Sequence, residues 1–309
     1  MFDLGSVIDG RFQLGRRVGK GGMGEVYRAR DQRTGQQVAL KILSGSSDRH
    51  LGRFAREAQL LSRLRHPAIV AYLGDGTAAP RRPYLVMEWL EGEELATILR
   101  RGRLLAGDTL AVLRRVADAL AFAHARGVVH RDIKPSNLFV VGGQIATLKI
   151  IDFGIAQDEA AVVGEETGLT QTGAALGTPG YMAPEQVRGA GEIGPAADIF
   201  ALGCVIYECL TGRRAFGGEH AVAVQAKILL EDLPPVSEIC PEVPPGVESL
   251  LQRMLSKDPA DRPQDGAALA EQQVAVVGRA DVEARLEQAG GDLVEVDRPV
   301  VVGAGRDGG

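Results

Sequence analysis

Short runs of alternating apolar and polar residues dominate about the first 90 positions of the chain. A period of two is typical of strands, and the runs occupy residues 11–15, 24–29, 37–42, 69–73 and 84–89. After the third run the period changes, and Phe54, Ala58, Leu61 and Leu64 recur at helical spacing within residues 50–65. The pattern predicts a small, mainly antiparallel sheet with one helix.

The pattern changes after Gly92, where helical periods take over. Residues 110–126 are amphipathic and end at Gly127, a residue type common at helix C-termini. Residues 198–210 are almost continuously apolar, which predicts a buried helix, and further helical segments are expected within 245–273. We therefore expect an α+β, bilobal fold, in which a small β-rich lobe joins a larger helical lobe.

These changes in pattern also predict boundaries. We expect one domain over residues 11–270, with a β-rich lobe over about 11–87, a hinge over about 88–92 and a helical lobe over about 93–270. Residues 274–309 are rich in glycine, valine and acidic residues, with one short helical pattern at 281–288. We interpret them as a tail or as a fragment of a further module.

Composition narrows the setting in which the chain works. The 309 residues are 45% hydrophobic and 24% charged, as in an ordinary soluble protein. The net charge of −5 argues against a nucleic-acid binder, since such domains carry a dominant basic surface. No run approaches the ~18 apolar residues of a membrane helix, and residues 1–10 lack a signal-peptide pattern. The three cysteines form no Cys-x-x-Cys pair, and their odd number does not indicate a disulfide framework, so a reducing compartment is expected. We therefore expect a cytoplasmic chain without a membrane segment.

A glycine-rich turn, Gly19-Lys-Gly-Gly-Met-Gly-Glu-Val26, separates the first two predicted strands. Glycines let a backbone approach phosphate oxygens and point its N–H groups at them. Dinucleotide-binding folds use a similar glycine pattern, but there a helix follows at once, whereas a strand is predicted here. On this turn alone, a phosphate-binding loop and a purely structural turn are both open.

A lysine of the third strand needs a charged partner. Lys41 follows three apolar residues in a run that should be buried, and a buried ammonium group is costly unless it is paired. Glu57, on the predicted helix, is the natural partner. Such a pair would hold the ammonium group where it can meet phosphates.

The most informative run is His130-Arg-Asp-Ile-Lys-Pro-Ser-Asn137, in which polar residues crowd together and Pro135 prevents a continuous helix. Further on, an apolar strand pattern delivers Asp152. Aspartate and asparagine oxygens suit Mg²⁺, so Asn137 and Asp152 could hold a metal ion on a polyphosphate. Asp132 would then be left to accept a hydroxyl proton.

Together these motifs resemble those of the eukaryotic-like (Hanks-type) protein kinases, and especially their bacterial serine/threonine branch. Six elements occur in order over about residues 11–270: the glycine loop, Val-Ala-Leu-Lys41, Glu57, His-Arg-Asp132 with Asn137, Asp152-Phe-Gly, and Ala183-Pro-Glu185. The resemblance implies a protein kinase fold and transfer of the γ-phosphate of ATP, with Mg²⁺ or Mn²⁺, to serine or threonine hydroxyls of proteins. The alternative is a pseudokinase scaffold that binds ATP without transfer, although such proteins lose residues of the Lys41, Asp132 or Asp152 type.

The resemblance also implies a role for each matched residue. The catalytic residues would be Asp132, Lys134 and Asn137, and the metal ligands would be Asn137 and Asp152. ATP would contact Val18, Gly19, Gly21, Gly22, Gly24, Val26, Ala39, Lys41, Glu57, Met87, Glu88, Leu90 and Phe139, with adenine between Val26, Ala39 and Phe139. Structural roles would fall to His130, Arg131, Phe153, Gly154, Thr178, Glu185, Asp198 and Arg262. Among these, Asp198 would anchor the catalytic loop, Glu185 would pair with Arg262, and Leu61 would stack on His130 and Phe153.

The long loop over residues 152–185 is expected to regulate activity, since loops of this length are usually functional or disordered. Thr170 and Thr172 resemble paired threonines that bacterial relatives autophosphorylate. Arg131, directly before the catalytic aspartate, would receive such a phosphate. The resemblance therefore implies phosphosites at both threonines and transient self-association during autophosphorylation.

Overall fold

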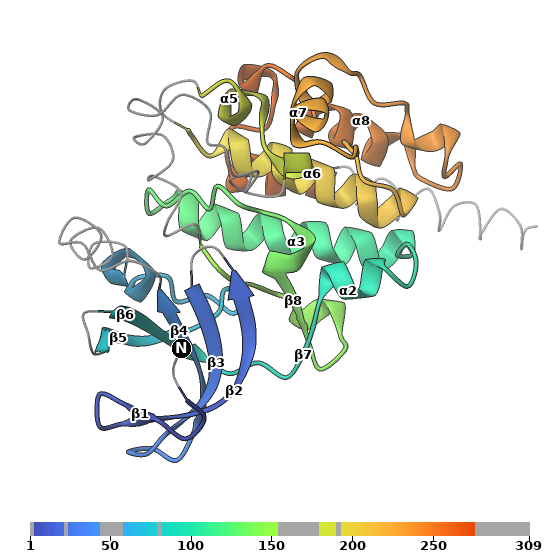
Figure 1. Ribbon diagram of the computed structural model, residues 1–309. Helices are drawn as coiled ribbons and strands as arrows, with labels where there is room; N and C mark the ends of the chain where they lie inside the picture. The colour runs from blue at the N-terminus through green and yellow to red at the C-terminus, as the bar shows by residue number, and fades with distance from the viewer. Residues whose placement is uncertain are drawn as a thin grey trace, which may run out of the picture.

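Strands come first along the chain and helices follow, so that two lobes of different character lie side by side (Figure 1). The computed structural model describes residues 3–21, 24–43, 58–78, 82–153, 179–189 and 193–275. No helix within these ranges is long and apolar enough to cross a membrane.

A six-stranded sheet forms the smaller lobe. Its strands are β1 (Val7–Ile8), β2 (Phe12–Gly21), β3 (Gly24–Asp31), β4 (Gln37–Leu43), β5 (Tyr72–Ala78) and β6 (Arg82–Glu88). They lie in the order β1-β2-β3-β4-β6-β5, and all neighbours are antiparallel. The core of this lobe includes the buried side chains of Phe12, Tyr27, Leu40 and Val86.

The register of the central strands decides which residues face the larger lobe. Val26 lies opposite Lys41, which lies opposite Leu85, and Ala39 lies opposite Met87. Directly opposed residues share one face of a sheet, as do residues two positions apart on one strand. Val26, Ala39, Lys41 and Met87 therefore stand on one face, while Tyr27, Leu40 and Val86 stand on the other.

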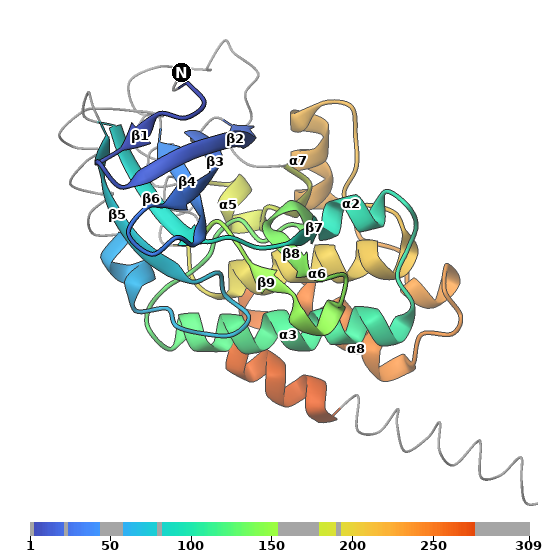
Figure 2. The same ribbon diagram turned by 90° about the horizontal axis from the view of Figure 1, so that it is seen from below.

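Helices build the larger lobe. They are α2 (Leu95–Leu99), α3 (Ala106–His124), α5 (Pro184–Val187), α6 (Ala196–Thr211), α7 (Ala221–Leu230) and α8 (Pro245–Met254). Helix α6 packs against α3 and α8, and every residue of α6 except Glu208 is buried. This burial on all sides explains its nearly continuous apolar sequence. A last helical segment, residues 266–275, lies beside α3 in Figure 2.

A second, three-stranded sheet lies between the lobes. It consists of β7 (Gly92–Glu94), β8 (Leu138–Val141) and β9 (Lys149–Ile150), in that order. Gly92 has a φ of +155°, and a Cβ there would lie 2.0 Å from the carbonyl oxygen of Val140, so no larger residue fits. Strand β8 follows the polar run 130–137, and β9 directly precedes Ile151 and Asp152. The β8–β9 pair thus carries both polar motifs to one place.

The long elements were predictable from the sequence, and the short ones were not. The strands expected over 11–15, 24–29 and 37–42 and the buried helix over 198–210 are confirmed. The prediction of a strand over 69–73 was wrong, because β5 begins at Tyr72 and Ile69 forms only an isolated parallel bridge with Ile150. The helix predicted over 110–126 covers Ala106–His124 instead. Of the helix predicted over 50–65, residues 58–62 are helical and residues 50–57 lie outside the described ranges, as does 281–288.

Candidate active site

Asp198 of α6 holds the polar run 130–137 in place. Its fully buried carboxylate accepts hydrogen bonds from the backbone N–H of His130 at 2.8 Å and of Arg131 at 2.7 Å. The Nε2 atom of His124, on α3, lies 2.8 Å from the same carboxylate. Arg131 has a φ of +66°, which is uncommon for a residue other than glycine. The carboxylate therefore stabilises a backbone turn that is costly on its own.

Two side chains of this run converge on one carboxylate oxygen of Asp132. Lys134 donates from Nζ to Oδ2 of Asp132 at 2.7 Å, and Asn137 donates from Nδ2 to the same oxygen at 3.0 Å. Asn137 also donates to the main-chain carbonyl of Asp132 at 2.8 Å. A 3-10 turn over Pro135–Asn137 makes this short return possible. The carboxylate of Asp132 is thus fixed in orientation next to a cation.

Asp152 connects the two lobes. Its Oδ1 lies 2.8 Å from Nζ of Lys41, whose side chain is only 9% exposed. The backbone N–H of Ile151 donates to the carbonyl of Asn137 at 2.8 Å, so Asn137 and Asp152 stand at adjacent ends of β8 and β9. The structure therefore brings Lys41, Asn137 and Asp152 together. Glu57, the partner predicted for Lys41, lies outside the described residues.

The sheet face beside Lys41 is apolar and half-buried. Val26, Ala39 and Met87 on this face, and Phe139 on β8, are all partly exposed, whereas the opposite face of the sheet is buried. Partly exposed apolar residues on facing elements are typical of a cleft that holds a flat apolar group. Leu90, after the end of β6, is also half-buried.

The glycine-rich turn joins β2 and β3 as a strand pair. Gly19 lies opposite Val26 and Gly21 lies opposite Gly24, while residues 22 and 23 lie outside the described ranges. Gly24 has a φ of +146°, and a Cβ there would lie 2.2 Å from the carbonyl oxygen of Ile42. Gly24 is therefore required by strand packing, whatever binds at the turn. Val18 is 43% exposed and lies at the register irregularity between Arg17 and Gly19.

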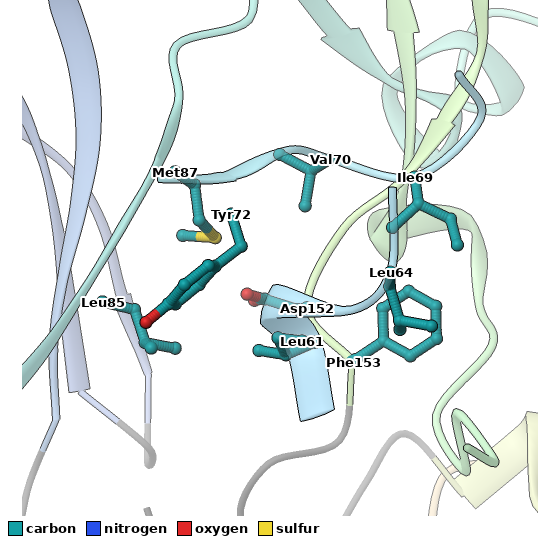
Figure 3. A pocket seen from close by; sticks show the side chains of 9 residues that line it. All are labelled: Leu61, Leu64, Ile69, Val70, Tyr72, Leu85, Met87, Asp152 and Phe153. Carbon is teal, nitrogen blue, oxygen red and sulfur yellow. The ribbon is translucent and has the colours of Figure 1, made fainter. Parts of the chain in front are cut away.

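A small cavity of about 20 Å³ lies at the back of the cleft, with room for about one water molecule (Figure 3). Its lining is Leu61, Leu64, Ile69, Val70, Tyr72, Leu85, Met87, Asp152 and Phe153. Figure 3 shows the ring of Phe153 directed toward Leu64, whereas the carboxylate of Asp152 points toward Tyr72. The side chains of these two neighbouring residues thus point in different directions. Phe153 packs in the apolar core, and Asp152 lies at the cleft.

Comparison with known sequences shows to which family the chain belongs. The family described as "Protein kinase domain" matches residues 12–274. This chain belongs to the protein kinase family. The chain is 41% identical over 282 residues to the serine/threonine-protein kinase PknA of Mycobacterium tuberculosis, covering 88% of this chain and 63% of PknA. It is 40% identical over 297 residues to the serine/threonine-protein kinase Pkn1 of Myxococcus xanthus, covering 94% of this chain and 42% of Pkn1. The chain therefore spans less than two thirds of either relative.

Solved structures agree on the bilobal kinase fold expected from the sequence. The crystal structure of the Mycobacterium tuberculosis PknI kinase domain matches with a TM-score of 0.68 at 26% identity, covering 89% of this chain and 99% of the chain in that structure. The crystal structure of Rad53 residues 1–466 in complex with AMP-PNP matches with a TM-score of 0.69 at 26% identity, covering 85% of this chain and 65% of the chain in that structure.

His130 of this chain is a buried histidine that links two segments of the site. Its ring lies 4.6 Å from the ring of Phe153, centroid to centroid. Desolvation lowers the pKa of His130, so the neutral ring is favoured. In that state Nε2 donates to the carbonyl of Ile151 at 3.2 Å and Nδ1 accepts from the N–H of Asp132 at 3.2 Å. His130 thus links the segment before Asp152 to Asp132.

A buried ion pair supports the segment that begins at residue 183. Arg262 donates from both terminal nitrogens to the carboxylate of Glu185, at 2.8 Å and 2.9 Å, and is only 2% exposed. Gln186 donates to the carbonyl of Arg131 at 3.0 Å and accepts from the N–H of Ala183 at 2.9 Å. These contacts tie the segment 183–186 to the run that contains Asp132.

The sequence interpretation missed several residues of this site. His124, Lys149 and Gln186 contact site residues or the backbone beside them, yet none was singled out. His124 had one available signal, since it lies in the last turn of the predicted helix, six residues before His130. Gly154, Thr170, Thr172 and Thr178 lie outside the described residues.

Proposed function

We propose that this chain is a serine/threonine protein kinase, which transfers the γ-phosphate of Mg-ATP to serine and threonine hydroxyls of proteins. The observation that carries the proposal is the convergence of Lys41, Asn137 and Asp152 beside the separately oriented carboxylate of Asp132. The choice of hydroxyl is supported by relatives that are named serine/threonine-protein kinases.

Asp132 is the residue that we assign to the incoming hydroxyl. Lys134 and Asn137 orient its carboxylate, so it can accept a proton without a prior rearrangement. In the transfer step the hydroxyl oxygen bonds to the γ-phosphorus, the bond from phosphorus to the β,γ-bridging oxygen breaks, and the hydroxyl proton passes to Asp132. Lys134 places positive charge where negative charge develops on the phosphoryl group.

Asn137 and Asp152 supply the oxygen ligands that a hard divalent cation needs. Asn137 uses its nitrogen on Asp132, so its side-chain oxygen is the atom left to face a metal ion. Within the described ranges, no group of three or more His, Cys, Asp or Glu side chains is placed to hold a metal ion. This fits a Mg²⁺ or Mn²⁺ ion that two side chains share with phosphates, rather than a site built wholly from protein. When bound, the ion would neutralise phosphate charge.

The half-buried face of the sheet is the surface that we assign to adenine. Val26 and Ala39 would cover the ring from the smaller lobe and Phe139 from the larger, with Met87 at the back. The N–H of Glu88 donates to the carbonyl of Ala71 at 2.9 Å, so the nucleotide would use other backbone groups of residues 88–90. Lys41 would meet the α- and β-phosphates, and the glycine-rich turn would cover them.

Regulation and setting are further parts of the proposal. Phosphate on Thr170 or Thr172 would pair with the guanidinium group of Arg131, and two copies of the chain would associate briefly to transfer it. Cys204, Cys209 and Cys240 are buried free thiols, which suits a reducing compartment, and we place the kinase in the cytoplasm.

Incubation with radiolabelled ATP, Mg²⁺ and a generic basic protein substrate tests the proposal. Label on the protein substrate is expected with the wild-type chain and absent with Asp132→Asn, which keeps the size of the side chain and removes the base. A pseudokinase or ATP-binding scaffold would bind the nucleotide and transfer nothing. Label on tyrosine would contradict the choice of serine and threonine hydroxyls. Equal label with the wild-type chain and with Asp132→Asn would contradict the role assigned to Asp132.

A further inference from the structure

The side chain of Glu88, at the end of β6, binds two separate elements. Its Oε1 accepts from the backbone N–H of Ala71 at 2.7 Å and from Nζ of Lys149 at 2.5 Å. The side chain of Glu88 is 29% exposed and that of Lys149 is 19% exposed. Charge-assisted hydrogen bonds with limited exposure are stronger than ordinary surface pairs.

Lys149 belongs to the strand that delivers Asp152. It lies on β9 opposite Phe139 of β8. Its neighbour Ile150 is held on the other edge of β9 by the segment 68–70, donating to the carbonyl of Ala68 at 2.8 Å and accepting from the N–H of Val70 at 2.9 Å. Glu88 therefore connects the end of β6 to β9 directly through Lys149 and indirectly through Ala71.

We propose that Glu88 and Lys149 are a pair of positioning residues for the nucleotide, which hold the adenine end of the cleft at a fixed distance from the phosphate end. This inference rests on the proposed function. Adenine would bind the backbone that follows β6, and the phosphates would lie near Asp152, three residues after Lys149. A ligand that contacts both ends binds more tightly when the distance between the ends is already fixed, because less conformational entropy is then lost on binding.

The carboxylate of Glu88 acts by holding two elements together, not by its charge on the nucleotide. Glu88 lies opposite Val38 and two positions after Val86, on the sheet face turned away from Lys41. Its contact with Lys149 holds the end of β6 against β9. Loss of either partner should therefore weaken nucleotide binding more than it slows transfer at saturating ATP.

Glu88→Gln, Lys149→Met and the double variant test the pair. Glutamine keeps an oxygen for the N–H of Ala71 and removes the charge, while methionine keeps the length of the lysine stem. We expect each single variant to raise the KM for ATP and the Kd for N-methylanthraniloyl-ATP about 5-fold, with kcat and the KM for the protein substrate within about 2-fold of wild type. Because the two partners act through one contact, the double variant should also show about a 5-fold change rather than the roughly 25-fold change of independent sites.

The exposed pair on α7 provides a matched control. Lys227 and Glu231 lie 3.7 Å apart, with about half of each side chain exposed. Lys227→Met and Glu231→Gln repeat the same replacements and should leave every constant at its wild-type value.

Several results would overturn the inference. One is that the single variants leave the KM for ATP and the Kd for the ATP analogue unchanged. Another is that the effects of the two single variants multiply in the double variant. A third is that a lower melting temperature is the only change. Phosphate transfer by the wild-type chain tests the proposed function separately. A wild-type chain that binds the nucleotide analogue but transfers nothing would contradict that function, and the Kd values would still test the pair.

Discussion

The Nζ atom of Lys41 lies 2.8 Å from Oδ1 of Asp152, although 111 positions separate the two residues along the chain. Lys41 reaches this contact from the sheet of the smaller lobe, and Asp152 reaches it from the end of β9 in the second sheet. The ion pair therefore spans the cleft between the lobes. A polyphosphate in this cleft would meet a cation from one lobe and, from the other, the carboxylate that we propose as a metal ligand.

Lys41→Met should reduce phosphate transfer roughly 100- to 1000-fold, as expected when one group that stabilises the transition state is removed. Methionine keeps the length of the side chain and fits its apolar neighbours. Asp152 is 37% exposed on its side chain, so water can solvate the carboxylate after the lysine is lost, and the free energy of unfolding should change by less than about 1 kcal/mol. Transfer assays and urea unfolding of the purified variant check both parts. Wild-type rates in the variant would show that Lys41 plays no part in transfer.

Glu185→Ala should lower the free energy of unfolding by about 3–5 kcal/mol, because it leaves the buried guanidinium group of Arg262 without its counter-charge. Glu231→Ala is the control, since it breaks an exposed pair with Lys227 and should cost about 0.5 kcal/mol or less. Urea unfolding of both variants measures the difference. A loss below about 1 kcal/mol for Glu185→Ala would mean that water or another acid replaces the carboxylate.

The sequence could name Asp132 and Asp152 as candidates, because the motifs that contain them resemble those of protein kinases. It could not name Lys149 or Gln186, because their contacts are with residues far along the chain and depend on how two sheets and a helix meet. The strand boundary at Tyr72 was missed for the same reason. The apolar run 69–73 contains one bridge to β9 and the start of β5, and its composition does not separate them.

Acidification should destabilise the fold in part through His130. Burial lowers the pKa of this histidine below its ordinary 6.5, whereas the unfolded chain takes up a proton near that value. Below about pH 6.5 the unfolded state binds more protons, so the free energy of unfolding should fall by up to about 1.4 kcal/mol per pH unit for this group. Urea unfolding between pH 8 and 5 measures the slope. His130→Phe keeps a ring beside Phe153 and should give a shallower slope, while His66, whose pKa burial also lowers, contributes equally in both proteins. Identical slopes would exclude His130 as a source.

A chain that ends after residue 275 should keep its fold and its transfer activity. The helix over 266–275 is docked on α3, where a Cβ at Gly266 would lie 2.1 Å from the backbone nitrogen of Ala121. The N–H of Gly266 donates to Nδ1 of His124 at 3.1 Å, and His124 in turn contacts Asp198. A chain that ends at residue 265 loses this helix and should melt at a lower temperature with reduced transfer. If the longer truncation product is inactive, residues 276–309 must contribute to the kinase domain.

Thr170→Ala/Thr172→Ala should be much less active than the wild-type chain, by roughly 10-fold or more if the loop must be ordered by charge-assisted bonds to phosphate. The backbone of Arg131 is fixed by two neighbours, since its N–H donates to Asp198 and its carbonyl accepts from Gln186. Its guanidinium group therefore starts from a defined point beside Asp132. A phosphothreonine adds about −1.5 to −2 charge, which the guanidinium group can pair with bidentately. Mass spectrometry of the purified wild-type chain should find phosphate on both threonines. Phosphatase treatment should remove this phosphate and lower the transfer activity in parallel. Asp132→Asn serves as the control, because it should carry no phosphate if the chain modifies itself. Full activity in a chain with both threonines unmodified would rule out this form of regulation.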